Sequence, residues 1–153
     1  MNPAALALLL LTMGNGPFDI MMFATSTAPA VEGAARLVYA PSPFGIAVTA
    51  DGRASYDAQI TVFHLPPPDS LGAFTSYVAW ETTTDLSEWH RLGTVRNGRN
   101  TVGRLELNKF LLVVTAEPDS LAATRAGPTV LHGNSPSGWL QSFITHPLFR
   151  GVN

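Results

Sequence analysis

The chain contains no cysteine among its 153 residues. A protein without cysteine has no disulfide and no thiolate nucleophile, and it cannot supply the thiolate ligands of a zinc ribbon, an iron–sulfur cluster or a blue-copper site. These classes of site are therefore excluded. The redox compartment stays open, because bacterial envelope domains often lack disulfides.

Charged residues are also scarce. They make up 13% of the chain, against about 25% in ordinary soluble domains. Much of the surface must therefore be uncharged or covered by another molecule. The net charge is -2, whereas nucleic-acid-binding domains usually carry a basic patch. We therefore do not expect nucleic acid as a partner.

No segment carries a complete catalytic or nucleotide-binding motif. Residues 133–137 resemble the G-x-S-x-G elbow of hydrolases but lack its last glycine, and neither a G-x-G-x-x-G nor a P-loop sequence is present. No two histidines have a metal-ligand spacing such as H-x-H or H-x-x-x-H. We expect no enzyme, metal or cofactor; an enzyme or metalloprotein that uses the histidines is the alternative. These histidines are His64, His90, His132 and His146.

Residues 1–30 differ from the rest of the chain. The uncharged run at residues 4–13 would span only about 15 Å as a helix, about half of a bilayer core. Residues 28–30 read Ala-Pro-Ala and resemble a signal-peptide cleavage site. Three interpretations remain open: a cleaved signal peptide, a retained segment that lies in the membrane interface or packs on a membrane partner, and an arm that folds onto its own domain.

From Val31 onward the sequence is typical of a β protein. Short runs rich in β-branched and aromatic residues recur at the spacing of sandwich strands, and Asp51-Gly52 and Asn97-Gly98 are hairpin-turn signals between them. No helical periodicity exceeds two turns. We therefore predict an all-β fold, an antiparallel, immunoglobulin-like β-sandwich of seven or eight strands over residues 31–134. It would lie between the N-terminal segment, residues 1–30, and a C-terminal tail, residues 135–153.

The run at residues 109–118 predicts the central strand of this fold. Apolar residues fill both sets of alternating positions, and side chains alternate across a strand, so neither face can be water-facing. Pro118 ends the strand because proline cannot donate a ladder hydrogen bond. Trp80 is the strongest candidate for a core aromatic residue.

Both ends of the chain are more apolar than a solvated tail would be. Tryptophan and phenylalanine near Arg150 fit a membrane interface, where the aromatic rings lie at headgroup depth and the cation reaches water. The alternative is that the tail packs on its own domain. We predict that residues of both ends contact a partner or the membrane. They are Leu8, Leu9, Leu10, Phe18, Met21, Met22, Phe23, Trp139, Leu140, Phe143, Leu148 and Phe149.

An ordered set of short motifs resembles the extracytoplasmic β domain of the anti-sigma-K factor family. The set consists of Tyr77-Val78-Ala79-Trp80, Leu92-Gly93, Val113-Val114-Thr115-Ala116-Glu117-Pro118 and Gly127-Pro128-Thr129-Val130-Leu131 with Gly133, within residues 57–133. The resemblance implies a β-sandwich on the outer face of a bacterial cytoplasmic membrane. The helical sigma-binding domain and the transmembrane helix of that family have no counterpart in residues 1–30, so sigma binding is not carried over.

These observations favour a non-catalytic accessory subunit on the periplasmic face of a multi-subunit bacterial membrane complex, where it would stabilise contacts between protein subunits. The N-terminal segment and the C-terminal tail would also contact the membrane interface. A general likeness to the small sandwich subunit of some bacterial photosynthetic reaction-centre and light-harvesting complexes suggests such a complex as the partner. The alternative is a secreted or membrane-attached periplasmic binding or sensor module, related to the β domains of anti-sigma factors.

Overall fold

The computed structural model of the chain describes residues 16–43, 45–48, 50, 52 and 54–136. Among these residues the regular elements are β-strands and one short 3-10 helix, and none of them is a helix long and apolar enough to cross a membrane. The strands are β1 (Asp19–Ala24), β2 (Glu32–Tyr39), β3 (Pro41–Ser42), β4 (Gly45–Ile46), β5 (Tyr56–Phe63), β6 (Ser76–Thr82), β7 (Trp89–Val95), β8 (Gly98–Arg104), β9 (Leu111–Glu117) and β10 (Thr129–Asn134), and the 3-10 helix is η1 (Pro68–Leu71).

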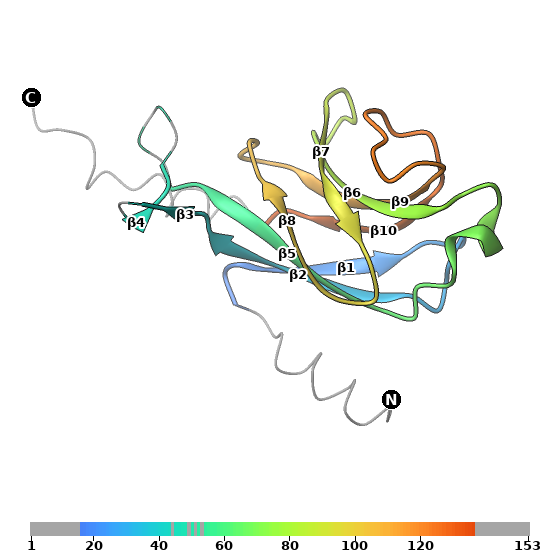
Figure 1. Cartoon of the computed structure of the whole chain (residues 1–153). Helices are drawn as coiled ribbons and strands as arrows, with labels where there is room; N and C mark the ends of the chain where they lie inside the picture. The colour runs from blue at the N-terminus through green and yellow to red at the C-terminus, as the bar shows by residue number, and fades with distance from the viewer. Residues whose placement is uncertain (1–15, 44, 49, 51, 53, 137–153) are drawn as a thin grey trace, which may run out of the picture.

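Eight strands form one antiparallel sheet in the order β7-β6-β9-β10-β1-β2-β5-β8. The sheet curls until its two end strands, β7 and β8, meet (Figure 1), so that it is nearly closed into a barrel. A Cβ atom on Gly103 of β8 would lie 2.8 Å from the backbone oxygen of Leu92 in β7, which is why only glycine fits there. The predicted all-β, antiparallel class is confirmed. β3 and β4 form a separate two-stranded hairpin that extends away from the barrel.

We call the line along which β7 and β8 meet the seam. Arg96 and Asn97 connect them at the predicted place, and Gly98 has a φ of +103°, which glycine adopts without strain, but Asn97 lacks the positive φ of a type I′ turn. The hairpin ladder expected there does not form, because β7 pairs with β6 and β8 pairs with β5. Instead, the side-chain amide of Asn100 accepts a hydrogen bond from the Arg96 N–H at 2.9 Å and donates one to the Arg96 carbonyl at 2.8 Å.

The other predicted turn, at residues 51 and 52, lies next to an isolated antiparallel bridge between Val48 and Ala54. Gly52 has a φ of +79°, as a tight turn requires. Asp51 lies outside the described residues.

Strand β9 is the strand that the sequence predicts to be buried on both faces, and the structure confirms this. It lies between β6 and β10, and every residue from 112 to 117 is buried. Leu112 and Val114 belong to the main core. On the opposite face, Val113 pairs with the fully buried Trp80 of β6. The prediction of Trp80 as a core aromatic is therefore confirmed.

The sheet begins earlier in the chain than the expected domain boundary at residue 31. β1 lies within residues 1–30, and it pairs with β2 through its first residues and with β10 through its last two. Ile20 and Met22 are buried in the core, whereas Met21 and Phe23 are 68% and 54% exposed. Residues 20–23 belong to the segment interpreted as signal-like or membrane-associated, and they lie in a strand with one buried and one exposed apolar face.

Candidate functional site

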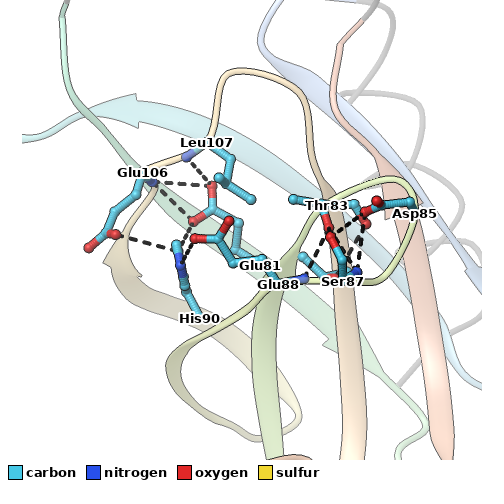
Figure 2. A network of polar contacts seen from close by, with 9 residues as sticks. Glu81, Thr83, Asp85, Ser87, Glu88, His90, Glu106 and Leu107 are labelled. Carbon is cyan, nitrogen blue, oxygen red and sulfur yellow. Dashed lines mark hydrogen bonds and ion pairs between the residues drawn. The ribbon is translucent and has the colours of Figure 1, made fainter.

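Four ionisable side chains meet at one end of the seam, and Figure 2 shows how they converge. Glu81 belongs to β6 and His90 to β7, where the two residues are direct partners in the strand pairing. Glu88 immediately precedes β7, and Glu106 follows β8. We call these four residues the His90 cluster.

Glu81 connects β6 to the segment that follows β8. Its side chain is fully buried, and its carboxylate accepts the backbone N–H of Glu106 at 3.0 and 3.2 Å and that of Leu107 at 2.9 Å. Burial raises the pKa of Glu81, while these N–H groups and His90 act against the rise. Because a buried carboxylate needs hydrogen-bond donors, Glu81 fixes the position of residues 106 and 107 against the neighbouring strands.

His90 lies among three carboxylates. Its Nε2 is 2.7 Å from Oε1 of Glu88, and its Nδ1 is 3.4 Å from Oε2 of both Glu81 and Glu106. Burial lowers the pKa of His90, but the hydrogen bonds to Glu88 and Glu81 and the negative charges of Glu106 and Glu81 outweigh it, so the pKa is raised. Since carboxylates only accept hydrogen bonds, the arrangement favours the imidazolium, in which both ring nitrogens donate.

The β6–β7 loop positions Glu88 for this contact (Figure 2). Oγ1 of Thr83 accepts the backbone N–H groups of Ser87 at 3.0 Å and of Glu88 at 3.2 Å. The hydroxyl groups of Thr83 and Ser87 and the Ser87 N–H lower the pKa of Asp85 to about 2. Leu86 is held at a φ of +62° within this loop, a conformation that is rare for a bulky residue. The loop is therefore fixed by its own hydrogen bonds.

The chemistry available to the His90 cluster is the uptake and release of a proton. His90 is 26% exposed, and Glu88 and Glu106 are 54% and 70% exposed, so water can reach the imidazole. No group of three potential ligands with a geometry that could hold a metal ion was found within the described part of the chain.

A second buried carboxylate, Glu117, lies at the end of β9. It accepts a hydrogen bond from the Thr115 hydroxyl at 2.6 Å and from the backbone N–H groups of Ala126 and Gly127 at 3.0 and 3.3 Å. Oγ1 of Thr115 in turn accepts the indole N–H of Trp80 at 2.8 Å. This chain of hydrogen bonds holds the loop between β9 and β10 and is structural.

A groove of about 410 Å³ lies at the opposite end of β6 and β7, beside the three prolines at residues 66–68. Pro67 has the extended conformation expected of a proline run (φ -53°, ψ 134°). The hydroxyl of Tyr77 donates to the Pro66 carbonyl at 2.8 Å. Arg96 lines the groove and is exposed, and no carboxylate is among the lining residues.

The residues predicted to contact a partner fall into separate groups. Phe18 is half-buried and packs with Tyr39 and Tyr56, with ring centroids 6.1 and 5.7 Å away. Met22 is in the core, whereas Met21 and Phe23 are exposed on the outer face of β1. The remaining predicted residues lie outside the described part of the chain: Leu8, Leu9, Leu10, Trp139, Leu140, Phe143, Leu148 and Phe149.

The His90 cluster is not among the sites predicted from the sequence. One signal for it was present, because Glu88 and His90 are two residues apart and so lie on one side of an extended segment. The contribution of Glu106 depends on the closure of the sheet, which no local pattern indicates. His64 follows β5 with a φ of +62°, and His132 of β10 lies beside Phe23, with ring centroids 6.1 Å apart.

Comparison of the chain with protein-family models, with curated proteins and with solved structures found no match in any of the three.

Proposed function

We propose that the chain is a non-catalytic accessory subunit that docks on a protein of a bacterial membrane complex through the outer face of β1. The observation that carries the proposal is the exposure of two large apolar side chains, Met21 at 68% and Phe23 at 54%, on one face of one strand. Water-exposed apolar side chains that gather on one face are typical of an interaction site.

The surroundings of this face suit docking. His132 extends the surface on the neighbouring strand β10. On the other side, Arg36 of β2 and Asp19 of β1 form an ion pair at 2.6 Å, so the apolar centre has a charged border, as protein interfaces commonly have. Full burial of a methionine or phenylalanine side chain contributes about 1.5–3 kcal/mol, and the part still exposed here would contribute about half of that at each position.

The proposed location is the periplasmic face of the cytoplasmic membrane. It is supported by the low charge, by the apolar residues 4–13 that precede β1 in the sequence, and by the resemblance to anti-sigma-K factor β domains. A photosynthetic reaction-centre or light-harvesting complex is the proposed partner, on the general likeness of sequence. The proposed finer fold is an immunoglobulin-like sandwich, and it is supported by the position of β1, which joins the four strands β7-β6-β9-β10 to the three strands β2-β5-β8.

Affinity purification of the tagged full-length chain from detergent-solubilised membranes of its source tests this function. We expect the native chain to recover a defined set of membrane proteins, with bound pigment if the complex is photosynthetic. The double variant Met21→Ser, Phe23→Ser should lose them. Leu121→Ser is the matched control, because Leu121 is 79% exposed on a loop outside β1. Equal recovery by the native chain and the double variant would contradict the proposal.

The groove beside residues 66–68 favours a second candidate function, a periplasmic binding or sensor module. Its lining includes one exposed cation, Arg96, and no carboxylate, which suits a small anionic ligand. A thermal-shift screen with small carboxylates tests it. A compound of this screen that raises the melting temperature of the native chain but not that of Arg96→Gln would support this function. A screen in which no compound raises the melting temperature of the native chain would contradict it.

A further inference from the structure

The seam is held at its two ends by side chains rather than by a strand ladder. At the turn end, Asn100 bridges to Arg96 and also donates to the Ile60 carbonyl of β5 at 3.1 Å. At the far end, Glu81 binds the backbone N–H groups of residues 106 and 107, and His90 is in contact with Glu106. Of these two sets of contacts, only the one at the far end is made by side chains that titrate, those of Glu81, His90 and Glu106.

We propose that the His90 cluster is a proton-operated latch on the seam: with a proton on His90 the segment after β8 is held against β6 and β7, and without it this segment is released. The geometry carries this proposal. A single imidazole lies within 3.4 Å of carboxylates from three places in the chain: Glu81 in β6, Glu88 before β7 and Glu106 after β8.

No other cation substitutes for His90 among the ion pairs of the described residues. Arg104 of β8 pairs with Asp57 of β5 at 3.7 Å. Arg91, next to His90, donates to the backbone carbonyl of Ser120. Arg125 lies over the ring of Trp89, 4.5 Å from its centroid. A neutral His90 therefore leaves three carboxylates facing one another, and like charges at this distance repel.

The direction of the pH dependence follows from the same contacts. The pKa of His90 is raised above its ordinary value of 6.5, so the closed seam binds the proton more tightly than the open seam. The stabilisation is therefore fully present below about pH 6.5 and is lost as the pH rises through the raised pKa. The pKa of Glu81 is also raised, by burial, and acts in the same direction.

Hydrogen exchange of the full-length chain, read at single amides by NMR between pH 5.5 and 9, tests the latch. The reporters are the amides of Glu106 and Leu107, which donate to Glu81. After correction for the intrinsic exchange rate, we expect their protection to fall as the pH rises through the pKa of His90, by at most about tenfold per pH unit, the limit for one linked proton. Amides of β9 such as Val114 should stay better protected than these two at every pH, because local release leaves β9 paired with β6 and β10.

Two variants decide the outcome. His90→Gln should remove the pH dependence at residues 106 and 107, whereas the control His132→Gln, which changes an exposed histidine of β10, should keep it. If His90→Gln does not fold, Glu106→Gln serves instead, because Glu106 is 70% exposed. This variant should lower the pKa of His90, measured by NMR, and move the loss of protection to lower pH.

Three results would overturn the latch. Protection of residues 106 and 107 that does not vary with pH in the native chain would exclude a latch. An unchanged pH dependence in His90→Gln would assign it to other groups. Equal protection of residues 106 and 107 and of the β9 amides at every pH would show exchange through global unfolding rather than local release. The latch does not depend on the docking face of β1, so its failure would leave the proposed function standing.

Discussion

Replacement of Glu117 by alanine should cost more stability than any surface change in this protein, because three donors depend on its carboxylate. These donors are the Thr115 hydroxyl at 2.6 Å and the backbone N–H groups of Ala126 and Gly127 at 3.0 and 3.3 Å. A buried donor without a partner costs about 1–3 kcal/mol. Thr115 is buried, whereas Ala126 is exposed and Gly127 half-buried, so water relieves part of this cost. The total loss is then about 2–4 kcal/mol, still a large part of the stability of about 5–15 kcal/mol of an ordinary domain.

Urea unfolding followed by tryptophan fluorescence measures this loss. Trp80 is a suitable probe, because its indole N–H donates to Thr115 within the same hydrogen-bonded chain. Glu117→Gln should lie between the native chain and Glu117→Ala: it keeps one acceptor oxygen but turns an NH₂ group toward backbone donors. Glu106→Ala is the control, since an exposed ion pair contributes about 0–1 kcal/mol. A loss below 1 kcal/mol for Glu117→Ala would show that the loop is not held by this carboxylate.

Two further predictions concern packing. Val113→Asp should prevent folding or cost several kcal/mol, because it buries an unpaired charge in a strand that is covered on both faces. The control Met21→Asp, on the exposed face of β1, should leave the urea midpoint nearly unchanged. Equal midpoints for the two variants would refute the double-sided burial of β9. Gly127→Ala should destabilise by about 1–3 kcal/mol or more, because the new Cβ would overlap the backbone oxygen of Ala116. Gly93→Ala meets only ordinary van der Waals contacts and should show little change in thermal melts, and a similar melting temperature for both glycine variants would contradict the tight approach at residue 127.

The sequence was sufficient to predict β9 and Trp80 because their signals are local. An apolar run that fills both alternating sets of positions, ended by Pro118, specifies a doubly buried strand without knowledge of its neighbours. The place of the connection at Asn97-Gly98 was predicted for the same reason, since the dipeptide alone favours a break between strands, and Gly98 has the positive φ. The pairing of the strands on either side of this connection depends on distant parts of the chain. The expected β7–β8 ladder does not form, because β7 pairs with β6 and β8 pairs with β5.

β1 shows why a boundary is harder to predict than a strand. Residues 20–23 are all apolar, so the pattern does not reveal that Ile20 and Met22 face the core while Met21 and Phe23 face outward. The distinction comes from the pairing with β2 and β10. A continuous apolar run is equally consistent with a membrane-associated segment and with a strand that has one exposed apolar face.

The His90 cluster was only partly readable from sequence. Glu88 and His90 are near in sequence. Glu81 meets His90 through the register of β6 and β7, and this register can be predicted only if the geometry of the loop between the two strands is known. Glu106 joins them only because the sheet curls until its end strands meet. The cluster therefore depends on the closure of the sheet and cannot be predicted from the composition of any one strand.

Site-specific photo-crosslinking tests the docking face of β1 most directly. A photo-reactive phenylalanine analogue is placed at position 21 in the full-length chain, which is expressed in its source cells. The same analogue at position 121 serves as the control, because Leu121 is at least as exposed to solvent as Met21 but lies on a loop. We expect position 21 to crosslink to one membrane-complex protein and position 121 to give no such product. No crosslink from position 21, or the same products from both positions, would contradict docking through β1.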